Sequence, residues 1–271
     1  MKLEQQNYIN NEYRPLSLFQ RKSFKKLYTD RKTLEVSMHL VSENFSRAIL
    51  ITKFISEFRR VYQKDKIEIA VIGGYKNEPE VRILKHFDYS VNVTTFGVEN
   101  EDFYLDLNLD LDSQYSQKFD LVLCSQVLEH VYNHDNFFKS IINLTKPNGF
   151  AWISCPASNI PHMLDSYYCA GVTAEYLAKN LKRFNIEILN FGQIGSIRLY
   201  KTVHTLRTWP TVKGYHNPVF YGDNSRPRYR QIFFLIRYIH RNFGLMFLSS
   251  KLTDDIRVAT ESWIFLKTKS K

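Results

Sequence analysis

The chain has 271 residues, 44% of them hydrophobic and 15% aromatic, which is enough to bury one large core and predicts one principal domain. Its three cysteines, Cys124, Cys155 and Cys169, form no Cys-x-x-Cys pair, which argues against a disulfide framework or a metal site and favours reduced core thiols. The N-terminus has no apolar signal region, and this predicts a cytoplasmic protein.

The formal net charge of +10 is unevenly distributed along the chain. Residues 1–66 have a balance of +7, residues 67–196 of −7 and residues 197–271 of +10. The basic character therefore belongs to the two flanks and not to the centre of the chain.

The first predicted elements lead into a glycine pair. Apolar residues recur at helical spacing over 34–62, which predicts one or two amphipathic helices in an N-terminal helical extension, residues 1–66. Residues 67–74 are an apolar run that ends in two glycines, typical of a buried parallel strand entering a tight loop. Residues 78–87 predict a helix with Pro79 in its first turn.

The rest of the centre alternates short strands with helices, which predicts an α/β fold with a parallel sheet covered on both faces. The link between the second and third strands is too short for a crossover helix. Glu129 and His130 are expected to begin a helix, and residues 147–149 to form a turn. The expected strands are 91–96, 103–106, 121–124, 151–155, 186–191 and 263–268, and the expected helices are 137–144 and 174–184.

Two segments, FDLVLCSQVLEHV at 119–131 and LTKPNG at 144–149, resemble class I S-adenosylmethionine-dependent methyltransferases. The resemblance covers about residues 67–196 plus the last strand. It implies a Rossmann-like, mostly parallel sheet with an antiparallel last strand, and S-adenosylmethionine as the cofactor. Residues 67–271 would be the methyltransferase-like domain, with an insertion, 197–258, before the last strand.

The loop after the first strand is where the resemblance implies binding of the cofactor's methionine part. The family pattern is an acid in the strand followed by Gly-x-Gly-x-Gly, and Gly73 and Gly74 begin this loop. Asparagine tolerates positive φ better than most residues. A cofactor cradle and a tight turn without a ligand both remain open. The positions that depart from the pattern are Tyr75 and Asn77 at the later glycines, and Val71 or Ala70 at the acid.

Other cofactor-binding candidates follow the next strands. The family's ribose-binding carboxylate would fall near Gly97, so Glu99 is a candidate substitute, with a solvated loop acid as the alternative. Asp106 matches the family position that meets the adenine amino group, although an aspartate there can also cap the following turn. Ser125 and Gln126 would line the adenine or methyl side.

Histidines are the catalytic candidates. His130 would accept a proton from an acceptor hydroxyl or amine, because histidine titrates near neutral pH; the alternative is that it fixes the loop by hydrogen bonds. The proline-containing loop after 151–155 resembles that of a methyltransferase subgroup linked with surface polysaccharides and small molecules. It makes His162 a second catalytic candidate, and Asp165 and Tyr167 candidates for substrate binding; packing is the alternative for Tyr167.

The resemblance therefore implies methyl transfer to a small-molecule acceptor, with a sugar of a glycan precursor as one candidate. Two other functions remain open: a scaffolding protein that has lost the cofactor, and an RNA methyltransferase, although no named RNA-binding module is present. The basic insertion contains an amphipathic stretch, 232–248, that would suit the inner membrane surface, a phosphorylated or lipid-linked acceptor, or packing on its own domain.

Overall fold

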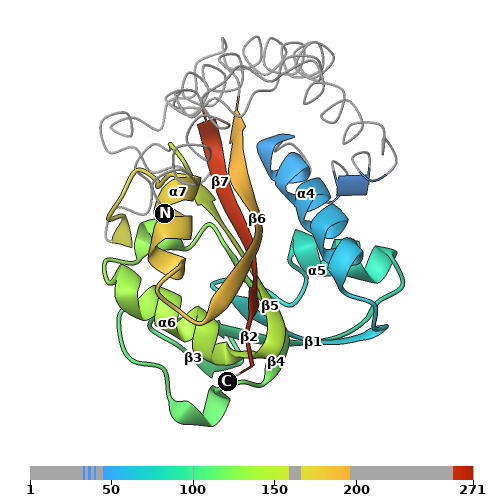
Figure 1. The fold of residues 1–271 in the computed structure, drawn as a ribbon, viewed down its shortest axis with the longest axis horizontal. Helices are drawn as coiled ribbons and strands as arrows, with labels where there is room; N and C mark the ends of the chain where they lie inside the picture. The colour runs from blue at the N-terminus through green and yellow to red at the C-terminus, as the bar shows by residue number, and fades with distance from the viewer. Residues whose placement is uncertain are drawn as a thin grey trace, which may run out of the picture.

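The structure is a computed structural model that describes residues 45–99, 101–158, 166–195 and 259–270, together with positions 33, 36, 37 and 40. Seven strands form one sheet in the order β3-β2-β1-β4-β5-β7-β6. Every neighbouring pair is parallel except the two that involve β7, which lies between β5 and β6 (Figure 1). The strands are β1 (Lys66–Ile72), β2 (Ser90–Gly97), β3 (Phe103–Tyr104), β4 (Phe119–Ser125), β5 (Thr145–Pro156), β6 (Ile186–Gly195) and β7 (Ala259–Thr268).

Helices cover both faces of this sheet. On one face lie α4 (Phe45–Val61) and α5 (Pro79–His86); on the other lie α6 (His134–Leu144) and α7 (Ala174–Leu181) (Figure 1). Two core clusters correspond to these faces, and successive residues of β1 alternate between them, because successive side chains of a strand point to opposite sides. The predicted Rossmann-like fold with an antiparallel last strand is confirmed.

The helix α4 packs directly on the sheet. Its Phe54 and Phe58 are fully buried, and the ring of Phe54 lies 5.4 Å from that of Trp152 on β5. Large buried aromatic side chains contribute much of a core's stability. The helix predicted in the N-terminal extension is therefore part of the core that supports the sheet.

Two local predictions at the carboxyl side of β4 and the start of β5 are wrong. Glu129 and His130 do not begin the next helix; they lie in a separate 3-10 turn, η2 (Leu128–His130), while Asn133 caps α6 by accepting a hydrogen bond from the Asn136 N–H. Asparagine competes well for this cap position, which explains the later helix start. The predicted turn 147–149 is a bulge inside β5, where the register with β4 shifts.

The link between β2 and β3 contains no helix among its described residues, as predicted. Instead, Asp102 Oδ2 accepts hydrogen bonds from the backbone N–H and the hydroxyl of Thr95, at 3.0 and 3.1 Å. The Asp102 side chain thus closes the short connection between β2 and β3. A second 3-10 turn, η1 (Ser113–Tyr115), lies between β3 and β4.

The insertion 197–258 and most of residues 1–44 lie outside the described residues, so the predicted domain boundaries remain predictions. Register places Gly195 beside Ala259, and Glu261 beside Pro156 at the carboxyl end of β5. The chain therefore leaves β6 and enters β7 at the edge where the parallel strands end. Within the described part of the chain, no helix has both the length and the apolar character needed to cross a bilayer.

Candidate cofactor and active site

The loop between β1 and α5 begins with a glycine that the backbone requires. Gly73 has φ +65°, and its N–H donates to the Phe96 carbonyl oxygen at 2.7 Å. A Cβ at Gly73 would lie 2.6 Å from Val127 Cγ2. Tyr75 and Asn77 are exposed, and neither has a positive φ. The loop therefore does not need an asparagine at position 77 for its backbone conformation.

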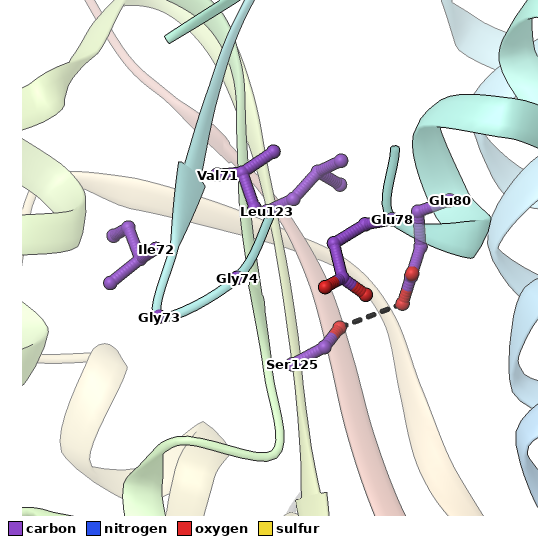
Figure 2. Close-up of a pocket in the computed structure, with 8 residues that line it drawn as sticks. All are labelled: Val71, Ile72, Gly73, Gly74, Glu78, Glu80, Leu123 and Ser125. Atoms are coloured by element: carbon purple, nitrogen blue, oxygen red, sulfur yellow. Dashed lines mark hydrogen bonds between the residues drawn. The ribbon is translucent and has the colours of Figure 1, made fainter. Parts of the chain in front are cut away.

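This loop opens onto a pocket at the carboxyl edge of the sheet. Figure 2 shows the carboxylates of Glu78 and Glu80 directed toward Ser125 at the end of β4. Val71 and Leu123 form its apolar wall on the face that α5 covers. The lining residues are Val71, Ile72, Gly73, Gly74, Glu78, Glu80, Leu123 and Ser125.

A buried polar network crosses the back of the pocket. Glu80 is 1% exposed; it pairs with Arg47 of α4 at 2.9 Å and accepts a hydrogen bond from the Ser125 hydroxyl at 2.7 Å. Arg47 also donates to Ser154 Oγ at 3.4 Å, and Ser154 donates to Ser125 Oγ at 3.0 Å. A buried carboxylate needs ionic or hydrogen-bonding partners, and Glu80 has both.

Glu78 is the second carboxylate of the pocket. Its Oε1 accepts the Tyr75 N–H at 3.2 Å, and its Oε2 lies 3.8 Å from Arg47 Nη2. Burial raises the pKa of Glu78, and the neighbouring charge of Glu80 raises it further, while the Tyr75 N–H and Arg47 oppose the shift. The pocket therefore holds two carboxylates against one guanidinium.

At the end of β2, the carboxylate that lies beside Gly97 is that of Glu101. A Cβ at Gly97 would lie 2.3 Å from Glu101 Cδ, so the Glu101 carboxylate occupies the space beside that glycine. Glu99 is exposed, and its N–H donates to Glu101 Oε2 at 3.0 Å. Glu101, rather than Glu99, brings a carboxylate to the strand end.

Asp106 lies after β3 and caps the turn that follows. Its Oδ1 accepts the N–H of Asn108 at 2.9 Å, while its Oδ2 has no hydrogen bond to the residues described. Asn108 in turn accepts the N–H groups of Tyr132 and Asn133 at 2.9 and 3.0 Å. The capping role is therefore present, and the second carboxylate oxygen is not used by it.

Gln126, at the end of β4, is held in an uncommon conformation. Its φ is +60°, its N–H donates to the Ser154 carbonyl oxygen at 2.7 Å, and its side-chain amide donates to Glu261 Oε2 at 3.0 Å. Non-glycine residues with positive φ are often found at functional sites. The side chain bonds toward β7, whereas Ser125 faces the glycine loop.

His130 lies in η2 and bonds to the loop beyond β5. Its Nδ1 is 2.9 Å from the Ser166 carbonyl oxygen. A carbonyl oxygen can only accept, so Nδ1 carries the proton and the lone pair of a neutral ring is on Nε2. The ring centroid of Tyr167 is 6.0 Å from that of His130. His162 and Asp165 lie outside the described residues.

No cluster of metal-ligating side chains occurs among the residues that the structure describes. Cys124 and Cys155 are buried, and burial raises the pKa of both thiols. A thiol that stays protonated is a poor nucleophile. These cysteines are core residues of the two central strands.

Residues 57–191 match the family model described as a methyltransferase domain. The same stretch contains β1 to β5 and the first part of β6, and the last strand of the sheet, β7, runs antiparallel between β5 and β6. The chain belongs to the class I S-adenosylmethionine-dependent methyltransferases.

Similar methyltransferases are named for an oxygen acceptor. The chain is 31% identical over 115 residues to a ubiquinone biosynthesis O-methyltransferase from Haemophilus ducreyi, covering 42% of this chain and 47% of the relative. An enzyme of the same name from Rickettsia canadensis is 26% identical over 136 residues, covering 47% and 56%. The chain spans about half the length of these relatives.

The [4+2]-cyclase SpnF is similar in structure, with a TM-score of 0.50 at 12% identity, covering 85% of this chain and 84% of that one. This likeness shows the fold alone. A fold of this class does not determine the reaction.

The methyltransferase site fits the chemical groups of its cofactor. S-adenosylmethionine presents an ammonium group, a ribose diol and an adenine, and carboxylates stand at three strand or helix ends of this edge: Glu78, Glu101 and Asp106. A Cβ at Gly74 would lie 2.8 Å from Glu78 Oε1, so this glycine leaves the space beside the carboxylate open.

Sequence reasoning missed several residues of this edge. Glu101 was hidden among neighbouring loop acids, and Arg47 lies in a helix far from the motif. The absence of an acid at positions 70 and 71 of β1 was the signal that could have directed attention to Glu78 and Glu80 in the segment that follows the glycines. The missed residues are Arg47, Glu78, Glu80, Glu101 and Ser154.

Proposed function

We propose that this methyltransferase transfers the methyl group of S-adenosylmethionine to a hydroxyl group of a small molecule. The observation that carries the proposal is the pocket at the carboxyl edge, where the Gly73 loop, Glu78 and Ser125 meet inside a methyltransferase domain. Ligands of open α/β sheets bind at this edge. The names of the relatives, O-methyltransferases, support oxygen as the accepting atom.

When bound, S-adenosylmethionine supplies an electrophilic methyl group on a positively charged sulfur. The glycine loop, Glu101 and Asp106 would hold it. His130 would accept the hydroxyl proton at Nε2, since the bond from Nδ1 to the Ser166 carbonyl sets the required tautomer. Much of the acceleration can come from orientation of the two reactants, which the rigid strand ends favour.

Within this proposal, the sugar of a glycan precursor is one acceptor to test. The basic flanks, +7 over residues 1–66 and +10 over 197–271, support an acceptor that carries phosphate or a lipid anchor. A cytoplasmic location, with contact at the inner membrane face, is part of the same proposal.

Calorimetry with S-adenosylmethionine and S-adenosylhomocysteine tests the cofactor, and release of S-adenosylhomocysteine with panels of sugar nucleotides and phenols tests the acceptor. We expect binding of both ligands and turnover with a hydroxyl-bearing panel member. No binding at millimolar ligand would instead support a scaffolding protein that has lost the cofactor. Steeply salt-dependent RNA binding would support the RNA methyltransferase.

A further inference from the structure

The first strand lacks the acid that the family pattern carries there. Val71 stands two residues before Gly73, is 2% exposed and lines the pocket on the face that α5 covers. Glu78 and Glu80 enter the same pocket from the start of α5 (Figure 2). Carboxylates are thus present beside the glycine loop, although positions 70 and 71 of the strand, Ala70 and Val71, provide none.

The two carboxylates differ in how they are satisfied. Glu80 is nearly inaccessible and has short contacts to both Arg47, at 2.9 Å, and Ser125, at 2.7 Å. Glu78 is partly exposed, and its distance of 3.8 Å to Arg47 is too long for a hydrogen bond. Arg47 is therefore the counter-ion of Glu80, and the negative charge of Glu78 is in excess.

The loop's own lysine does not neutralise that charge. Lys76 Nζ lies 2.6 Å from Asp102 Oδ1, in the connection between β2 and β3. Among the residues that the structure describes, the neighbours that favour the Glu78 carboxylate are the Tyr75 N–H, at 3.2 Å, and Arg47, at 3.8 Å. One unbalanced, partly desolvated carboxylate in a pocket favours a cationic ligand group.

We propose that Glu78 binds the α-ammonium group at the amino-acid end of the cofactor, in place of the acid that the family pattern carries at position 70 or 71 of β1. Glu80 is the positioning residue: it holds Arg47 at the back of the pocket and leaves Glu78 facing the ligand. This inference rests on the proposed function, because it assumes that the pocket takes S-adenosylmethionine.

Two ligands separate the amino-acid end from the rest of the cofactor. S-adenosylhomocysteine carries the ammonium group, whereas 5′-methylthioadenosine has the same nucleoside and sulfur without it. Calorimetry with both ligands would be performed on the full chain, on Glu78→Gln and on the control Glu187→Gln. Glu187 is exposed near the amino end of β6, beside Lys267, and the pocket lies at the other, carboxyl end of the parallel strands.

We expect Glu78→Gln to weaken S-adenosylhomocysteine binding about tenfold or more, the effect of losing a charge-assisted hydrogen bond. The affinity for 5′-methylthioadenosine should not change in Glu78→Gln, which also shows that the variant is folded. Neither affinity should change in Glu187→Gln.

Four results would overturn the inference. Equal losses for both ligands in Glu78→Gln, or no loss for either, would show that Glu78 does not bind the ammonium group. Wild-type binding of 5′-methylthioadenosine without S-adenosylhomocysteine would show that the pocket excludes the amino-acid end. If the wild type binds neither ligand, the proposed function is overturned as well. In the other cases the wild type still binds at least one ligand, so the two kinds of failure can be distinguished.

Discussion

The carboxylate of Glu101 fills the space that a side chain at Gly97 would take, with Glu101 Cδ only 2.3 Å from the place of a Cβ at Gly97. β2 ends in a glycine, yet an acid four residues later folds back to the strand end. The adenosine part of a cofactor would meet a carboxylate at this edge even though the last residue of β2, Gly97, has no side chain.

Glu101→Gln should therefore weaken S-adenosylhomocysteine and 5′-methylthioadenosine alike by about tenfold, because both ligands carry the ribose diol. Calorimetry measures both affinities. Glu99→Gln is the matched control: Glu99 is exposed and contacts Glu101 through its backbone, so its affinities should equal those of the wild type. A loss in Glu99→Gln alone would restore Glu99 as the ribose-binding acid.

Removing Glu80 should destabilise the fold, because Arg47 would keep a charge in a position where only 12% of its side chain is exposed. We expect Glu80→Ala to lower the free energy of unfolding by about 3 kcal/mol. Urea unfolding of Glu80→Ala, Arg47→Ala and the double variant measures the coupling. The double variant should lose less than the sum of the single losses; strict additivity would show that the pair contributes nothing as a pair.

The pH dependence of cofactor binding should reflect Glu78. Burial raises its pKa, so the carboxylate takes up a proton at a higher pH than an exposed glutamate does. As the pH falls through this raised pKa, the charge that would bind the ammonium group disappears and S-adenosylhomocysteine affinity should fall. Calorimetry between neutral and mildly acidic pH should show no such fall for 5′-methylthioadenosine or in Glu78→Gln. Parallel curves for the two ligands would contradict this assignment.

The raised pKa of Glu78 affects folding stability in the opposite direction: affinity for the ligand should fall as the pH falls, whereas the contribution of Glu78 to stability falls as the pH rises. The folded protein holds the Glu78 proton more tightly than the unfolded chain, so the contribution of Glu78 to stability is lost as the pH rises through the folded pKa. Glu78→Gln, which cannot ionise, should be at least as stable as the wild type at neutral pH. Thermal unfolding at neutral and mildly acidic pH measures this difference.

Gly73→Ala should cost about 1–2 kcal/mol, since a side chain is strained at positive φ and its Cβ would lie 2.6 Å from Val127 Cγ2. Gly192→Ala is the control, because its Cβ would find its nearest neighbour, Trp263 Cζ2, at 3.4 Å. Thermal unfolding of both variants, with S-adenosylhomocysteine binding, provides the comparison. A Gly73→Ala variant with unchanged stability and affinity would show that the loop tolerates another conformation.

The order of strands and helices along the chain, and the edge of the sheet at which the site lies, can be inferred from the sequence alone. Short apolar runs, such as 67–72 and 121–124, alternate with amphipathic helices. This periodicity is a local property of the sequence, so it predicts the elements without information on tertiary contacts. It located the loop at Gly73 and the exits of β3 and β4. It failed at Glu129 and His130, where the Asn133 cap decided the start of α6.

Which side chains meet at that edge depends on the three-dimensional fold. Arg47 and Ser154 are 107 residues apart, Glu80 and Ser125 are 45 apart, and Gln126 and Glu261 are 135 apart. No local pattern encodes such pairs, because they depend on the order in which strands lie in the sheet and on the helix that covers each face. Glu78 lines the pocket and the Glu101 carboxylate lies beside Gly97; in our proposal these two residues take the place of the acids that the family pattern has in β1 and at the end of β2.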